Sequence, residues 1–152
     1  MDENAKRRYE YLKKKNQEKN KQDRWENNTL FMECIQKIGD FKMISENECE
    51  QLLEKISLAI PFFYSGHIKW DETKCEKKIV EYDQLKNYIY VSKYYYVIWD
   101  DYEIPPIKCR LQSIIDNVDD VEAVSFGYLI ISDDYKIVLE SKKFGSVNFG
   151  IL

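Results

Sequence analysis

The sequence predicts a small α+β domain, and three observations support that prediction. Residues 94–99 form a continuous apolar run, Tyr-Tyr-Tyr-Val-Ile-Trp, which is typical of an interior strand. A helical pattern follows over residues 107–118, and three strand-like segments separated by short turns complete the chain. We therefore expect N-terminal helices packed on a mixed sheet of four or more strands, with a strand–helix–strand crossover and a C-terminal meander.

Residues 1–28 are expected to form a charged arm or helix, followed by a single α+β domain over residues 29–152. Residues 1–26 hold nine Lys/Arg against six Asp/Glu, a net charge of +3, whereas residues 27–152 hold fourteen against twenty-one, a net charge of −7. Two interpretations of the arm stay open. It is either a solubilising exposed helix or an arm that binds nucleic acid or another anionic surface through Lys13, Lys14 and Lys15.

Two helices are expected next. Asn28 or Thr29 caps a helix that runs to about Ile38. The S-x-x-E spacing of Ser45 and Glu48 predicts the start of a second helix. Each helix carries one apolar stripe, so we expect the two to pack as a pair. The stripes are Phe31, Cys34, Ile35 and Ile38 in the first, and Cys49, Leu52, Leu53, Ile56 and Ile60 in the second.

The second half of the chain carries the sheet, while residues 62–93 do not decide between helix and strand. Pro105 and Pro106 suit the first turn of a helix. Strands are expected over residues 121–131, 136–140 and 146–151, with turns at residues 133–134 and 143–145. The buried stripe of the helix before them is expected to be Ile107, Leu111, Ile114, Ile115 and Val118.

Composition excludes several classes of protein. The N-terminus lacks the apolar segment of a signal peptide, and no run approaches the roughly 20 apolar residues of a membrane span, so we expect a cytoplasmic protein without a membrane partner. The four cysteines are widely spaced, and His67 is the sole histidine, so neither a metal site nor another cofactor is expected. A P-loop, G-x-G-x-x-G and G-x-S-x-G are all absent, so we expect no catalytic residues.

One short motif keeps an enzymatic alternative open. Glu140-Ser141-Lys142 ends a predicted strand, and a carboxylate followed by lysine at a strand end occurs in metal-dependent nucleases. A second carboxylate from Asp119, Asp120 or Asp133 would complete a magnesium site. A three-residue pattern is weak in a chain that is 33% charged.

Acidic residues gather at the turns of the predicted sheet. Residues 83–140 hold eleven Asp/Glu against five Lys/Arg, a net charge of −6. These acids are either ordinary solvated turns and helix caps, or a surface that binds a basic partner. The candidate partner-binding residues are Asp100, Asp101, Tyr102, Glu103, Asp119, Asp120, Glu122 and Tyr128.

A series of motifs in the second half resembles a known family. These are Trp99-Asp100-Asp101, Ile104-Pro105, Asp119-Asp120-Val121, Ala123 to Phe126, and Ile137 to Glu140. Over about residues 66–151 the chain resembles small immunity proteins of bacterial contact-dependent growth inhibition and related polymorphic-toxin systems. The sequence departs from that family at Gly127 and Tyr128, where an Asp and a Trp are expected, and at Lys142-Lys143.

The resemblance implies a binding protein and not an enzyme. Such a protein neutralises a cognate toxin by stoichiometric binding to the toxin's C-terminal domain. The acidic surface suggests that this domain is basic, for example a nuclease, and that the immunity protein does not bind nucleic acid directly. The alternatives are a nuclease using Glu140 and Lys142, and a nucleic-acid-binding protein using the N-terminal arm.

Overall fold

Seven strands form one sheet, in the order β1-β4-β3-β5-β6-β7-β2. The computed structural model describes residues 3–63, 67–75, 77–101, 103–125, 127–141 and 146–152, and for residues 15–24 it describes the backbone alone. The strands are β1 (Phe41–Met43), β2 (Lys78–Glu81), β3 (Tyr94–Trp99), β4 (Ile107–Arg110), β5 (Tyr128–Ser132), β6 (Ile137–Ser141) and β7 (Ser146–Ile151). The predicted α+β class is confirmed, and β5, β6 and β7 form the predicted C-terminal meander.

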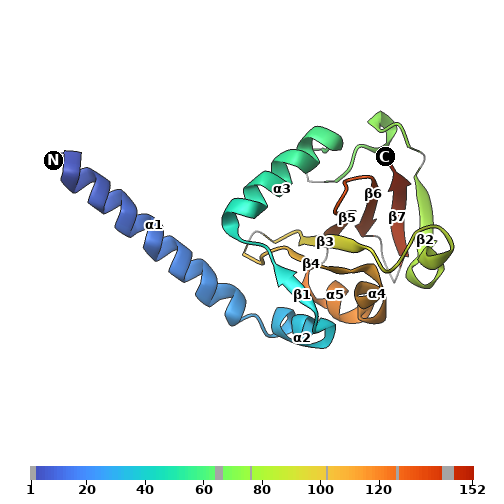
Figure 1. Ribbon diagram of the computed structural model, residues 1–152, viewed down its shortest axis with the longest axis horizontal. Coiled ribbons are helices and arrows are strands. Elements are labelled where there is room, and N and C mark those ends of the chain that lie inside the picture. The colour runs from blue at the N-terminus through green and yellow to red at the C-terminus, as the bar shows by residue number, and fades with distance from the viewer. Residues whose placement is uncertain (1–2, 64–66, 76, 102, 126, 142–145) are drawn as a thin grey trace.

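Helices cover both faces of this sheet (Figure 1). The larger core lies between one face and the helices α2 (Thr29–Ile38), α4 (Leu111–Asp116) and α5 (Val118–Val124). On the other face, α3 (Glu46–Ala59) covers a smaller cluster that includes Ile131 and Val138. The smaller cluster leaves Ile98 and Leu129 only partly buried, so this face is incompletely covered.

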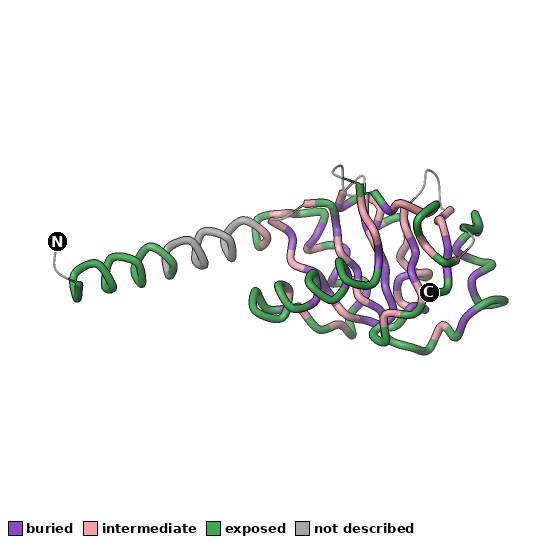
Figure 2. Tube along the Cα trace, turned by 90° about the horizontal axis from the view of Figure 1, so that it is seen from above, coloured by how far each residue is buried: buried purple, intermediate pink, exposed green. Residues whose placement is uncertain are grey.

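The long helix α1 (Glu3–Glu26) extends away from the sheet (Figures 1 and 2). Its side chains are exposed over residues 3–14. Contact with the body comes at its end, where the Trp25 ring meets Phe31 edge-on with centroids 5.9 Å apart. Within the described chain, no helix combines the length and the apolar character that crossing a bilayer requires.

The helix α2 matches its prediction closely. The Asn28 side chain caps it by accepting a hydrogen bond of 2.9 Å from the Phe31 amide. Gly39 ends it with a φ of +75°, a conformation that glycine adopts without a Cβ penalty. All four residues of the predicted stripe are buried, so the amphipathic pattern identified the correct face.

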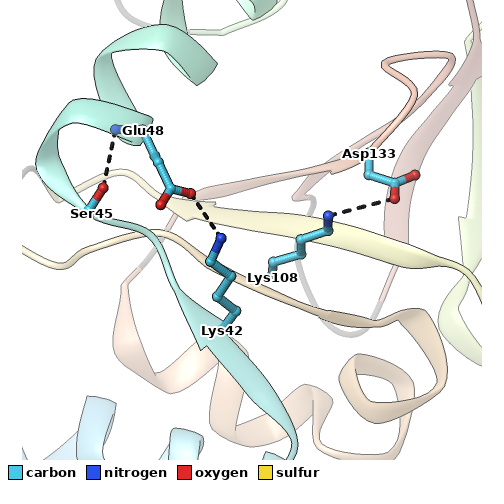
Figure 3. Close-up of polar contacts among 5 residues, drawn as sticks. All are labelled: Lys42, Ser45, Glu48, Lys108 and Asp133. Carbon is cyan, nitrogen blue, oxygen red and sulfur yellow. Dashed lines mark hydrogen bonds and ion pairs between the residues drawn. The ribbon is translucent and has the colours of Figure 1, made fainter.

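The start of α3 is also confirmed, since the Ser45 hydroxyl accepts a 3.3 Å hydrogen bond from the Glu48 amide. The Glu48 carboxylate binds Lys42 Nζ at 3.2 Å (Figure 3). The prediction that the two helices pack as a pair is wrong, because they lie on opposite faces of the sheet. The intervening residues 41–43 form the edge strand β1 on β4, which carries the chain from one face to the other.

The predicted crossover is displaced by one strand. Residues 107–110 form β4 and not a helical turn, because Ile107 and Cys109 alternate with Lys108 and Arg110 between core and surface. The helical segments are α4 and α5, and β5 begins only at Tyr128, so the predictions of a helix from 107 and a strand from 121 are wrong at those ends.

All strand pairs in the described part of the chain are antiparallel, so the sheet is not the mixed one that we predicted. The intervening strand explains the difference. Both β4 and β5 pair antiparallel with β3, one on each side, so they run parallel to each other without touching. The α4–α5 segment therefore crosses over β3.

The segment that the sequence left undecided is mostly irregular. Ile68 makes an isolated bridge with Phe62. Two short 3-10 segments follow, η1 (Trp70–Glu72) and η2 (Tyr82–Asn87), with the edge strand β2 between them. Trp70 lies against Gly150 of β7, where a Cβ would come within 2.6 Å of the ring, so this glycine lets the segment pack on the sheet.

Candidate functional site

The C-terminal end of β3 brings together several of the acidic residues that the sequence singled out. The Asp100 amide donates a 2.8 Å hydrogen bond to the Gly127 carbonyl, just before β5. Trp99 Nε1 donates a 2.9 Å bond to the Val121 carbonyl of α5. These two bonds join the acidic turn after β3 to the start of β5 and to α5.

The turn at Asp101 is built from local hydrogen bonds. Its Oδ1 accepts from the Glu103 amide at 3.0 Å, and its carbonyl accepts from the Ile104 amide at 3.0 Å. Ile104 is buried in the larger core and anchors the turn. Tyr102, proposed from the sequence as an aromatic anchor, lies outside the described residues.

The helix α5 supplies the other acids. Asp119 is exposed, and Glu122 lies one turn further along the same helix. Asp120 instead binds Lys37 of α2 at 2.9 Å, and this hydrogen bond raises the pKa of Lys37. Asp120 therefore contributes to the docking of two helices, while Asp119 and Glu122 have no ion pair among the described residues.

Tyr128 lies inside this end of the sheet and not on its surface. It is 5% exposed, and its hydroxyl lies 2.5 Å from the Tyr82 hydroxyl and donates to Glu122 Oε1 at 3.2 Å. Burial is the main cause of the raised pKa of Tyr128, and the neighbouring Tyr82 and Glu122 raise it further. The Tyr128 hydroxyl therefore helps to position the Glu122 carboxylate.

We call Asp100, Asp101, Glu103, Asp119 and Glu122 the acidic end of the sheet. Among the described residues, Asp100 and Asp101, like the two α5 acids above, have no ion pair with a lysine or arginine. Unpaired carboxylates of one sign concentrate the negative potential that attracts a cationic partner.

The acids of the β5–β6 turn lie at the opposite end of the strands. Asp133 Oδ2 lies 3.7 Å from Lys108 Nζ on β4 (Figure 3). Asp134 accepts bonds from the Ser132 hydroxyl at 2.6 Å and the Lys136 amide at 3.1 Å, and these bonds lower its pKa. The sequence grouped all acidic turns together. In the structure, the antiparallel register separates Asp133 and Asp134 from the acidic end.

A cavity that the sequence did not reveal adjoins the acidic end. It has a volume of about 350 Å³ and lies between α3 and the incompletely covered face of the sheet. Its walls include Leu53 and Ile56 of α3, Phe62, Ile98 of β3 and Leu129 of β5. Asp100, Glu140 and His67 supply its polar lining, together with Ser57 and Ser141.

Glu140 has a different role from the one that the nuclease alternative gave it. Its Oε2 accepts from the Ile68 amide at 2.7 Å, while Oε1 accepts from Trp70 Nε1 at 3.0 Å and Asn148 Nδ2 at 3.2 Å. The Glu140 carboxylate thus holds Ile68 and Trp70 against the sheet. Lys142 lies outside the described residues, and within them no group of three His, Cys, Asp or Glu side chains is placed to hold a metal.

None of the four cysteines, all of them described, forms a disulfide in the structure, and Cys34 and Cys109 are buried. Burial raises the pKa of each of these two thiols to about 12, so they remain neutral core groups.

A sequence model of the family described as CdiI immunity protein EcoliA0-like matches residues 28–150, a span that begins just after α1. Comparison with curated proteins gives no match. The resemblance to immunity proteins of contact-dependent inhibition, which rested on motifs in the second half, is confirmed and extends over α2 and α3. Because the match covers most of its length, the chain belongs to the family of CdiI immunity proteins.

Proposed function

We propose that this immunity protein neutralises its toxin by stoichiometric, non-catalytic binding through the acidic end of the sheet. The observation that supports this surface is its charge: Asp100 and Asp101 in the turn after β3, and Asp119 and Glu122 in α5, have no ion pair with a lysine or arginine in the described structure. Charges held on hydrogen-bonded turns need little reordering when a partner arrives, which favours fast association.

The proposed partner is the basic C-terminal domain of the cognate toxin. A toxin that acts on nucleic acid presents lysines and arginines where phosphates bind, and an acidic surface can occupy that site in place of substrate. The binding residues in this proposal are Asp100, Asp101, Glu103, Asp119 and Glu122. Tyr128 and Asp120 act through the packing that holds these acids in place.

The same proposal assigns residues 29–152 as the working domain and retains the cytoplasmic location expected from the sequence. The exposed α1 lies outside the family match and is not required for toxin binding in this proposal. Removing residues 1–26 should therefore leave neutralisation intact. Loss of binding in that variant would point instead to the basic arm.

The test uses the toxin C-terminal domain encoded immediately upstream of this gene. Purified toxin domain and immunity protein are mixed at increasing ratios, and complex mass and residual toxin activity are measured together. We expect a one-to-one complex, with activity falling to zero at one equivalent. Absence of a complex, or full inactivation at a small fraction of one equivalent, would contradict stoichiometric binding.

A further inference from the structure

The cavity beside the acidic end has a mixed chemistry that suits one kind of side chain. Its walls are apolar where α3 faces β3 and β5, while two carboxylates, Asp100 and Glu140, contribute to the same lining. A lysine or arginine side chain has the matching composition, with a methylene stem that packs on apolar surface and a cationic head.

Both carboxylates are held in place before any partner arrives. Glu140 is fixed by the three N–H groups described above, all of them neutral, so its negative charge is not cancelled. The Asp100 backbone is tied to Gly127, and its side chain is exposed and has no ion pair among the described residues. Apolar walls around such charges strengthen their attraction for a cation.

We infer that this cavity is a socket for one lysine or arginine side chain of the toxin. The inference rests on the proposed function and adds a specific anchor to it: the basic side chain inserts between α3 and the sheet, with its head beside Asp100 and Glu140. A volume of about 350 Å³ is sufficient for such a side chain. A single desolvated cationic anchor near the centre of an interface can carry much of its binding energy.

The test places a lysine of this protein where the toxin's side chain would go. Ser57 lines the cavity from the last turns of α3. Within the described residues its hydroxyl donates a 2.8 Å hydrogen bond to the Leu53 carbonyl of the same helix. In Ser57→Lys the new ammonium group can occupy the socket. The matched control is Leu58→Lys, which adds the same charge at a neighbouring position that is 84% exposed and does not line the cavity.

We expect Ser57→Lys to weaken toxin binding by roughly 30-fold, the loss typical of blocking a central anchor, and Leu58→Lys to change it less than about 3-fold. A second pair removes charge: Asp100→Asn should weaken binding, whereas Asp40→Asn, at an exposed position before β1, should not. Thermal unfolding of all four variants checks that they fold. Equal binding by the two lysine variants would overturn the socket while leaving the proposed function intact.

A second measurement decides the matter without the toxin. Nα-acetyl-arginine amide and its neutral analogue Nα-acetyl-citrulline amide are titrated into the full chain, and the methyl resonances of Ile56, Ile98 and Leu129 are followed by NMR. We expect shifts with the arginine compound alone, and their loss in Ser57→Lys. The absence of arginine-specific shifts would overturn the socket. Failure of the wild-type chain to bind the toxin domain is a separate outcome, and it would overturn the proposed function.

Discussion

The two ends of β3 differ in how their charges are balanced. At the acidic end, Asp100, Asp101, Asp119 and Glu122 have no ion pair among the described residues. At the other end Lys108 lies 3.7 Å from Asp133 (Figure 3) and 5.4 Å from the Tyr96 ring centroid. The Arg110 guanidinium lies over the Tyr94 ring, 5.5 Å from its centroid. We call the second set the basic–aromatic end.

This difference indicates where a charged partner is needed. At the basic–aromatic end each cation named above already has a carboxylate or an aromatic face, so a partner would have to compete with contacts inside the protein. At Asp100, Asp101, Asp119 and Glu122 a cationic partner would add interactions without breaking an ion pair among the described residues. The presence or absence of a neighbouring group that balances each charge therefore distinguishes the two ends more clearly than net charge does.

The largest expected effect is on toxin association. Replacing Asp100 and Asp101 together by lysine reverses the potential at the acidic end, so the association rate constant should fall by about 10- to 100-fold at low salt. The Asp101 change also removes the 3.0 Å hydrogen bond from the Glu103 amide, so the free energy of unfolding should fall by about 1 kcal/mol. Stopped-flow mixing at several salt concentrations measures the rate, and an unchanged rate at low salt would contradict the electrostatic role.

The next effect is on stability beneath the acidic end. Tyr128→Phe removes the hydroxyl that lies 2.5 Å from the Tyr82 hydroxyl. Tyr82 is only 4% exposed, so its hydroxyl loses a hydrogen-bond partner in a buried position. The expected loss is about 1–3 kcal/mol in the free energy of unfolding. Tyr94→Phe, at a ring that is 40% exposed, is the control and should cost less than about 0.5 kcal/mol. Equal losses in urea denaturation would show that the buried pair has no special role.

Alkaline pH should weaken the larger core through its thiols. Burial raises the pKa of Cys34 and Cys109 from 9.0 to about 12, so each stays protonated in the folded protein after it would ionise in the unfolded chain. The corresponding stability is complete below pH 9.0 and is lost as pH rises toward 12. Between neutral pH and about pH 10, we expect the free energy of unfolding to fall by roughly 1 kcal/mol per thiol. Over the same pH interval, the free energy of unfolding of Cys34→Ala should fall by less than that of the wild type.

The smallest effect is expected at the basic–aromatic end. Lys108→Met removes an ion pair with Asp133 in which the two side chains are 29% and 42% exposed, so the free energy of unfolding should fall by less than about 1 kcal/mol. Toxin affinity should stay within about 2-fold of the wild type, because this end lies outside the proposed interface. A large loss of affinity on calorimetric titration would erase the distinction between the two ends.

Local signals in the sequence predicted the elements whose ends are fixed by nearby residues. Asn28 and Ser45 cap α2 and α3 as expected, and the apolar run of residues 94–99 is β3. The error at β4 has a local cause too. Ile107 and Leu111 are four residues apart, which fits a helical stripe, while four residues of alternation are too few to reveal the short strand.

Non-local features were beyond the sequence. The placement of α3 on the second face depends on β1 pairing with β4, residues more than sixty positions apart, and no local pattern encodes that pairing. The separation of Asp133 from Asp100 depends on strand register, and the cavity depends on how much of the sheet α3 leaves uncovered. The acidic residues were identifiable as a set, but their division between two ends of the sheet required the fold.

The acidic end is the surface that we propose meets the toxin. Amide hydrogen exchange of the free protein and of its complex with the upstream-encoded toxin domain tests this directly. We predict slowed exchange in residues 98–101, 118–125 and 127–129, with little change in residues 93–96 and 108–110. Slowed exchange confined to the basic–aromatic end, with none at the acidic end, would contradict the account.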